Sequence, residues 1–176
     1  MAGSARKLAG STHEIASIDE LYEMPGHLIR RMHQASMAIF DAEISAAGFD
    51  LTSVQFAAMT MIANNPGLDQ ATLAAAIAFD RATTGGVIDR LEAKGLVRRE
   101  IVKGDRRSRH LHLEPAGKAL LKGVTPVVHR SQQLMLDGLN DKERTTFLTL
   151  LWKALQAASE VSRPAAKPHT LGKTVK

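Results

Sequence analysis

The chain of 176 residues contains no cysteine. This absence excludes disulfide bonds, zinc sites built on thiolates and a cysteine switch that responds to peroxide. Any sensing by this protein must therefore use other chemistry.

Long apolar runs are also absent from the sequence. No stretch approaches the roughly 20 apolar residues that a membrane-spanning helix needs. The first seven residues, MAGSARK, lack the apolar core of a signal peptide. We therefore expect a cytoplasmic protein with no membrane partner.

Motifs that carry enzyme chemistry are missing too. No glycine-rich loop follows a strand to cradle phosphate, and no recognisable motif joins serine, histidine and an acid. Gly85 and Gly86 fall inside an expected helix, so they do not form a nucleotide-binding fingerprint. His110 and His112 share one face of an expected strand, but two histidines without a carboxylate pair make a weak metal site. We expect neither an enzyme nor a bound cofactor or metal.

Positive charge is what the chain does have, and it is concentrated in one segment. The formal net charge is +5 and the pI is about 9.7. Residues 81–109 alone hold nine Lys or Arg against four Asp or Glu. A local excess of this kind suits a polyanionic partner such as nucleic acid.

At both ends of the chain, apolar residues do not recur at the spacing of a helix or a strand. Residues 1–18 are small and polar, and residues 159–176 carry prolines, a glycine and cations. We expect two flexible tails around one folded domain at 19–158.

The first periodic segment predicts a long amphipathic helix from about residue 18 to 47. Gly48 ends this helix. Its apolar stripe consists of Leu28, Met32, Ala35 and Ile39.

A pair of short helices is predicted further along the chain. Thr52 opens a helix with capping-box spacing, and the Asn-Asn-Pro-Gly sequence at 64–67 ends it. A short helix at about 69–78 is followed at once by Asp80, a good N-cap for a helix that runs to residues 94–95. Two short helices joined by a tight turn form a helix-turn-helix.

A basic β-hairpin follows this pair of helices. Residues 96–102 and 109–113 alternate as strands, and a Gly-Asp turn lies between them. The tip, residues 103–109, reads KGDRRSR. A helix followed by a basic hairpin suits insertion of one element into a DNA groove, with the other against the backbone or the neighbouring groove.

Two helices complete the predicted fold. The first begins at Pro115 and runs to about residue 138, and the second opens at Asn140. The last helix has more apolar residues than a small DNA-reading core can cover. We therefore expect residues 19–48 and 115–158 to bury one another across a two-fold homodimer.

These residues resemble the MarR family of winged helix-turn-helix regulators. The resemblance rests on DRATTGGVIDRLEAKGLV at 80–97 and DRRSRHLHLEPAG at 105–117, and its order and spacing extend over about residues 20–158. Two positions depart from the family pattern. Glu114 stands where the family usually has threonine, and Gly86 stands where many members have an arginine that contacts DNA.

The resemblance implies a mainly α fold with a small β-hairpin wing, in which residues 52–113 form the winged helix-turn-helix. It implies a homodimeric repressor that reads a pseudo-palindromic operator, with half-sites roughly 10 base pairs apart. Arg107 would enter a narrow minor groove, where the negative potential favours arginine. The full set of candidate DNA contacts is Arg81, Thr83, Thr84, Arg90, Lys103, Arg106, Arg107 and Arg109.

Two points on this face stay open in the sequence. Arg90 could bind phosphate or pair with Asp89 or Glu92. The glycines at 85 and 86 could allow close approach to the duplex or close packing against a neighbouring helix.

Members of the family often bind small aromatic or anionic effectors between the dimer helices and the DNA-reading domain. A cation and an imidazole beside an apolar wall would suit an aromatic carboxylate. The candidate effector residues are His27, Arg31, Gln34, Phe56 and Met59. The alternative is that the polar stripe on the first helix is solvated or pairs with acids across the dimer, and that the methionine belongs to the core.

A second class of function also fits a winged helix. The fold does not by itself imply DNA binding, so a protein-interaction module without specific DNA binding is the alternative. The clustered arginines of the hairpin tip favour DNA, and retention on heparin with loss at high salt would discriminate the two.

Overall fold

The computed structural model describes residues 17–102 and 105–162, with the backbone alone for residues 102, 105–108, 161 and 162. The chain forms two compact units, 1–135 and 136–176, which we describe separately. The expected single domain over 19–158 remains a prediction.

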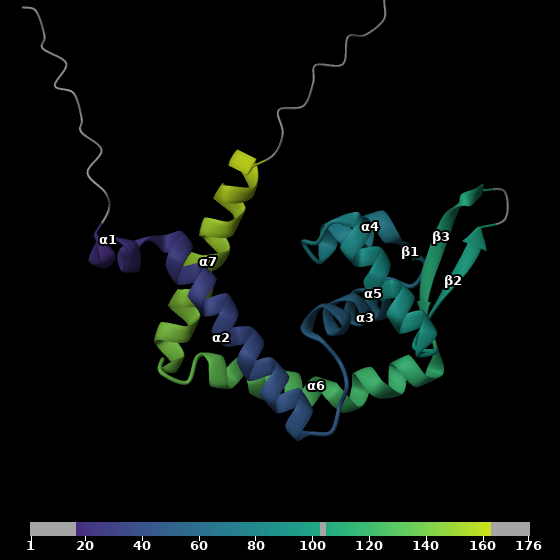
Figure 1. Ribbon diagram of the computed structural model, residues 1–176, viewed down its shortest axis with the longest axis horizontal. Helices are drawn as coiled ribbons and strands as arrows, with labels where there is room; N and C mark the ends of the chain where they lie inside the picture. The colour runs from purple at the N-terminus through teal and green to yellow at the C-terminus, as the bar shows by residue number, and fades with distance from the viewer. Residues whose placement is uncertain (1–16, 103–104, 163–176) are drawn as a thin grey trace, which may run out of the picture. The chain divides into compact units, whose positions relative to one another are not determined.

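The first unit begins with two helices in place of the one expected. α1 spans Ile18–Glu23 and α2 spans Pro25–Ala46 (Figure 1). Met24 between them has extended backbone, with φ −67° and ψ 124°, because the ring of a following proline disfavours the helical conformation. The prediction of one continuous helix over 18–47 was therefore wrong at this point. Its end was correct, since Gly48 follows with φ +76°.

Three helices form the helix-turn-helix region, and each begins at a side-chain cap. α3 spans Ser53–Asn64, α4 spans Gln70–Ala76 and α5 spans Arg81–Ala93. Their caps are Thr52, Asp69 and Asp80, whose side chains accept hydrogen bonds from amides of the first turn. The predicted starts of these helices are confirmed.

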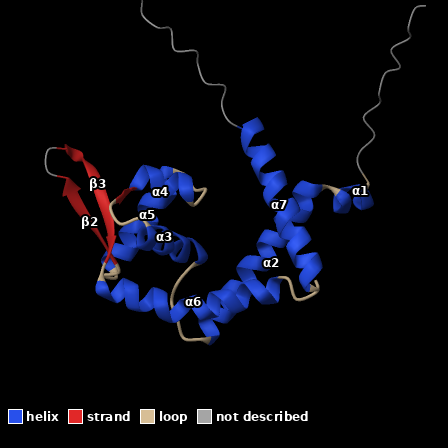
Figure 2. Ribbon diagram, turned by 180° about the vertical axis from the view of Figure 1, so that it is seen from behind, coloured by secondary structure: helices blue, strands red, loops and turns tan. Residues whose placement is uncertain are grey.

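A small antiparallel sheet packs beside these helices, as both ribbon views show (Figures 1 and 2). Its strands are β1 (Leu68–Asp69), β2 (Val97–Val102) and β3 (Asp105–Leu113), in the order β1-β3-β2. Leu111 of β3 pairs with Leu68 on one side and with Arg99 on the other. The hairpin was predicted, but β1 was not, because a strand of two residues is too short to show an alternation of apolar and polar side chains.

The core of the first unit is formed by α2 to α5, the sheet and the helix that follows it, whereas α1 contributes no buried residue. Its most deeply buried side chains, at most 1% exposed, include Met59, Ile62, Leu73, Val87, Ile88, Leu91, Leu111 and Val124. Because α5 contributes Val87, Ile88 and Leu91 to this core, its remaining face is left for a partner.

The last helix of the first unit is α6, Pro115–Met135, which packs against α2 and α3. In the second unit α7 spans Asp141–Ser162, four residues beyond the expected end at 158. Asn140 caps α7, and its own amide donates to the carboxylate of Glu143 at 2.9 Å. Within the described ranges no helix is both long and apolar enough to cross a membrane.

Candidate nucleic-acid interface and cavity

Asp80 fixes the start of α5. Its carboxylate accepts a hydrogen bond from the Thr83 amide at 2.8 Å and another from the Thr83 hydroxyl at 2.6 Å. The Thr83 hydroxyl, followed by the amide, lowers the pKa of Asp80 below its usual value of 3.8. Asp80 is therefore ionised at neutral pH, and the first turn of α5 is held in place.

The predicted contacts on α5 separate into exposed and buried residues. Arg81 and Thr83 are exposed in its first turn, where a groove-reading helix reaches base edges. Thr84 is 0% exposed, and its hydroxyl donates to the Asp80 carbonyl at 2.9 Å. This burial does not fit the prediction that Thr84 contacts DNA, because its side chain faces the core.

The two glycines of α5 have different surroundings. A Cβ at Gly85 would lie 3.1 Å from Nε2 of Gln70 on α4, so this glycine allows close packing between the two helices. A Cβ at Gly86 would meet only Nη1 of Arg90, at 3.8 Å. Close helix packing thus accounts for Gly85, whereas Gly86 has room for a partner.

Arg99 of β2 connects the hairpin to α5. Its guanidinium lies 2.6 Å from Asp89 and 2.6 Å from Glu92, and its amide donates to Glu92 at 3.1 Å. These two acids were the alternative partners considered for Arg90. Since Arg99 binds both, and Arg90 forms no ion pair with any described residue, Arg90 is available for phosphate.

Some of the cations counted in the sequence are already paired. Lys94 lies 2.6 Å from Asp50, and Arg98 lies within 3.1 Å of both Glu100 and Glu114. Fewer cations are therefore free to attract a polyanionic partner than the sequence count suggests. In the described part of the chain, the cations of this segment without an ion pair are Arg81, Arg90 and Arg109.

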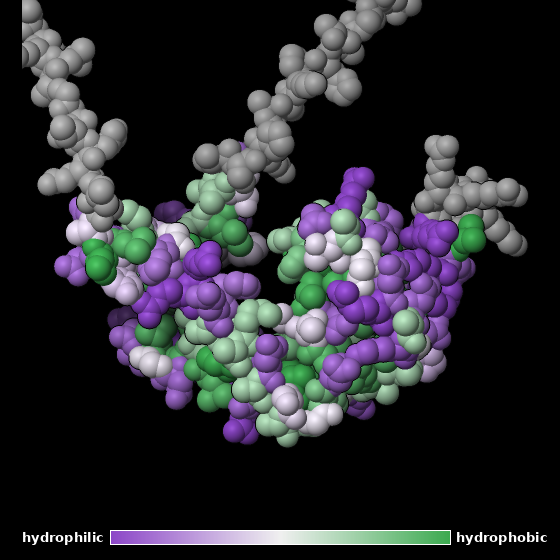
Figure 3. Space-filling view, viewed as in Figure 1, coloured by the Kyte–Doolittle hydropathy of each residue, from purple (hydrophilic) through white to green (hydrophobic). Residues whose placement is uncertain are grey.

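The remaining predicted contacts belong to the wing. Lys103 lies outside the described residues, and so do the side chains of Arg106 and Arg107, whose backbone belongs to β3. Arg109 is exposed on β3, opposite Ile101 of β2. Hydrophilic residues cover much of the surface around β2 and β3 (Figure 3).

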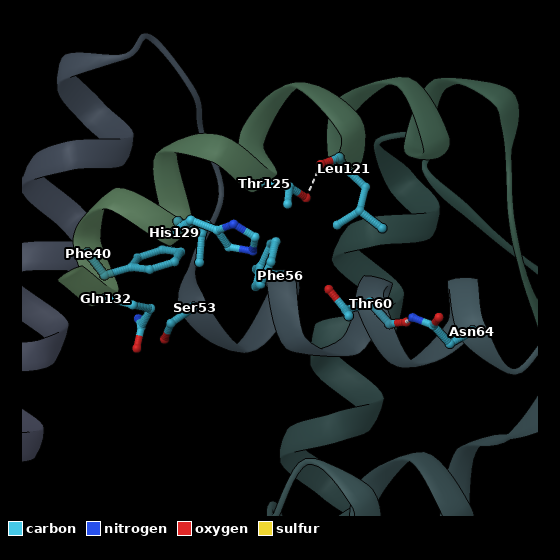
Figure 4. Close-up of a pocket in the computed structure, with 10 residues that line it drawn as sticks. Phe40, Ser53, Phe56, Thr60, Asn64, Leu121, Thr125, His129 and Gln132 are labelled. Atoms are coloured by element: carbon cyan, nitrogen blue, oxygen red, sulfur yellow. Dashed lines mark hydrogen bonds between the residues drawn. The ribbon is translucent and has the colours of Figure 1, made fainter. Parts of the chain in front are cut away.

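A cavity of about 530 Å³ opens between α2, α3 and α6 (Figure 4). Its wall includes the rings of Phe40 and Phe56, and its polar groups include Thr60 and His129. The Thr60 hydroxyl is buried and has no hydrogen-bond partner among the described residues. The lining contains no lysine or arginine; it consists of Phe40, Ser53, Phe56, Thr60, Asn64, Leu121, Thr125, Val128, His129 and Gln132.

The predicted effector residues do not gather at this cavity within one chain. Phe56 lines it, whereas Met59 is 0% exposed in the core. His27, on α2, lies about 20 Å along the helix axis from Phe40, at 1.5 Å per residue. Arg31 is stacked on the ring of Tyr22, with its guanidinium carbon 5.4 Å from the ring centre.

The other α2 candidate, Gln34, is exposed and does not line the cavity. Sequence reasoning missed Thr60 and His129. Thr60 follows Phe56 by one helical turn and is the one polar residue of the segment AAMTMIA at 57–63, which was the available signal. His129 had no comparable local signal.

Comparisons with known proteins agree with this arrangement. The MarR family model matches residues 51–108. The transcriptional repressor NicR of Pseudomonas putida strain KT2440 is 35% identical over 138 residues, which cover 78% of this chain and 86% of NicR.

Two solved structures extend the similarity to the fold. BpsR of Bordetella bronchiseptica, whose DNA binding is regulated by 6-hydroxynicotinic acid, is 34% identical, with a TM-score of 0.69 over 73% of this chain and 96% of BpsR. PcaV of Streptomyces coelicolor, solved with its natural ligand, is 30% identical, with a TM-score of 0.73 over 82% of this chain and 99% of PcaV. These matches confirm the expected winged helix-turn-helix. The chain belongs to the MarR family, and it is a DNA-binding transcriptional regulator rather than an enzyme.

Proposed function

We propose that this regulator is a homodimeric repressor that a small aromatic acid releases from a pseudo-palindromic operator. The observation that carries the proposal is the position of the cavity. One wall of the cavity is α3, and α3 also packs against α5, which begins with the exposed Arg81 and Thr83. A ligand in the cavity would therefore act on the helix that supports α5.

The chemistry of the cavity supports an aromatic effector. Phe40 and Phe56 offer ring faces, and the Thr60 hydroxyl offers an unused hydrogen bond. His129 is the one titratable side chain of the lining, so it is our candidate partner for a carboxylate. The relation of BpsR to 6-hydroxynicotinic acid supports the same ligand class.

The exposed apolar side chains of the helices at both ends of the chain support a homodimer. These helices carry large apolar side chains that are between 40% and 72% exposed, and such clusters indicate a surface that is buried against another subunit. They are Ile18, Leu21, Tyr22, Met24, Leu28 and Ile29 near the start, and Leu148, Leu150, Leu151, Trp152 and Leu155 on α7. Leu28 belongs to the stripe that the sequence assigned to the dimer.

On DNA, we propose that Arg81 and Thr83 reach base edges and that Arg90 binds phosphate. Arg109 lies on β3. For Arg109, and for Lys103, Arg106 and Arg107 of the same sequence segment, we propose minor-groove and backbone contacts. The unpaired state of Arg81, Arg90 and Arg109 within the described residues supports these roles.

The test begins with selection of binding sites from random DNA and measurement of affinity by fluorescence anisotropy at fixed salt. We expect a palindromic site and its release by one member of a panel of benzoates, hydroxycinnamates and pyridine carboxylates. Arg107→Ala should weaken binding, whereas Arg98→Ala is the matched control, because Arg98 is already paired with Glu100. A palindrome without release would contradict the effector class, and no selected site would favour an interaction module.

A further inference from the structure

Phe79 is an aromatic residue that the core does not accommodate. It lies in the turn between α4 and α5, immediately before the cap residue Asp80, and 45% of it is exposed. Ile77, two residues earlier, packs against the core, but Phe79 does not belong to that cluster. The turn thus places one apolar side chain inward and leaves the next one open to solvent.

The usual partner for an apolar residue at this position is missing. A residue just before an N-cap commonly packs against the fourth residue of the helix, as a hydrophobic staple. Here that fourth residue is Thr84, which is fully buried and whose hydroxyl donates to the Asp80 carbonyl. Local packing therefore does not explain an aromatic residue at position 79.

The backbone nevertheless holds Phe79 in a defined place. Its amide donates to the Ala74 carbonyl at 3.1 Å, which closes the end of α4. Ala78 before it has φ +57°, an uncommon conformation for a residue with a side chain. Asp80 after it is fixed by Thr83. The side chain thus projects from a rigid turn.

We infer that Phe79 contacts the 5-methyl group of a thymine in the major groove and contributes to operator specificity. The inference rests on the proposed reading of a specific operator by α5. Arg81 and Thr83, the exposed polar residues of the first turn, can make hydrogen bonds to base edges. The thymine methyl is an apolar group on the major-groove edge of the base pair, and Phe79 supplies an exposed aromatic side chain two residues before Arg81 that can contact it.

The experiment combines protein variants with operators that contain deoxyuridine, which lacks this methyl group. Each thymine of the selected half-site is replaced in turn, and binding is measured for the wild type, Phe79→Ala and Phe79→Leu. One replacement should weaken wild-type binding about fourfold, the value expected for one buried methyl-sized group. Phe79→Ala should bind the thymine and deoxyuridine operators equally, and Phe79→Leu should keep part of the difference.

Ile101→Ala is the control, because Ile101 is also exposed, at 61%, but lies on the wing opposite Arg109 and not in the turn before α5. It should keep the wild-type dependence on that thymine. Binding to random DNA, which depends mainly on phosphate contacts, should be the same for the wild type and both Phe79 variants. This result would also show that the variants are folded.

The outcomes separate the two proposals. If the wild type selects a specific site but no thymine replacement couples to Phe79, the role of Phe79 is overturned while the proposed repressor stands. If no specific site is selected, the proposed operator reading fails, and the inference fails with it.

Discussion

The guanidinium of Arg99 on β2 lies 2.6 Å from the carboxylate of Glu92 on α5. The same guanidinium reaches Asp89, one helical turn earlier, and only 15% of the Arg99 side chain is exposed. The link therefore joins the wing to the face of α5 that does not enter the core. A displacement of α5 by an effector would move β2 as well.

Arg99→Met should lower the free energy of unfolding by about 1 kcal/mol, since it removes hydrogen bonds between charged groups that are only partly exposed to solvent. It should also weaken operator binding, because the wing loses its link to α5. Urea denaturation and anisotropy measure the two effects. Arg98→Met is the control: Arg98 is 49% exposed, and its loss should change stability by less than about 0.5 kcal/mol. Equal losses of stability in the two variants would contradict this role of Arg99.

Gly117 near the start of α6 has no room for a side chain. A Cβ there would overlap the Leu96 carbonyl oxygen and lie 3.0 Å from the carbonyl carbon. Gly117→Ala should therefore lower the free energy of unfolding by about 2 kcal/mol or more. Gly123 lies in the same helix, and its Cβ would make ordinary contact with the Phe49 ring at 3.5 Å.

The matched substitution Gly123→Ala should raise the free energy of unfolding by about 0.5 to 1 kcal/mol, because alanine favours a helix interior. Thermal unfolding of both variants tests whether the two changes in unfolding free energy have opposite signs. A loss of stability at Gly123 would show that the Phe49 ring cannot accept the added methyl group, whereas unchanged stability at Gly117 would contradict the clash with the Leu96 carbonyl.

The helix starts could be predicted from sequence because their causes are local. Thr52, Asp69, Asp80 and Asn140 each accept hydrogen bonds from amides within three residues. A pattern confined to one turn of helix is fully visible in the sequence. The resemblance of the 80–97 and 105–117 segments then supplied the family.

Features that depend on distant parts of the chain could not be predicted in the same way. Its place in the first turns of α5 predicts that Thr84 reaches DNA, but the packing of α5 on the core buries its side chain. The cavity brings α6 against α2 and α3, which lie more than 50 residues earlier in the chain, so no local pattern marks His129. The prediction of His27 rested on local helical spacing alone. The break at Pro25 is the exception, because the restriction that proline places on Met24 is local and was visible in the sequence.

The cap at Asp80 predicts a dependence of stability on acid pH. The pKa of Asp80 is lowered in the folded protein, first by the Thr83 hydroxyl and then by the Thr83 amide. A carboxylate with a lowered folded pKa stabilises the protein above its unfolded pKa, and this contribution is lost as the pH falls through the folded pKa. The difference in unfolding free energy between the wild type and Asp80→Asn should therefore be constant at neutral pH and shrink below pH 3.8.

Urea denaturation at a series of pH values measures this difference. Thr83→Ala removes the largest cause of the lowered pKa and so brings the folded pKa closer to the unfolded one. In that background the difference made by Asp80→Asn should be smaller, and its loss on acidification should be complete at a higher pH. A pH profile unchanged by Thr83→Ala would show that the hydroxyl does not set the pKa.

The unpaired hydroxyl of Thr60 predicts opposite effects on stability and on effector binding. Its Oγ1 atom is buried at the cavity wall and has no hydrogen-bond partner in the part of the chain that the structure describes. Thr60→Val keeps the shape and removes the unsatisfied group, so the ligand-free protein should gain about 1 kcal/mol. The same change should raise the effector concentration needed for operator release, because the ligand loses a hydrogen bond.

Thr125→Val is the matched control, since the Thr125 hydroxyl also lines the cavity but already donates to the Leu121 carbonyl at 2.7 Å. That variant should gain no stability and should release the operator at the wild-type effector concentration. Thermal unfolding without ligand and anisotropy with increasing effector give the two readouts. If Thr60→Val gained stability but left the release concentration unchanged, the hydroxyl would be a packing defect of α3 rather than a group that meets the effector.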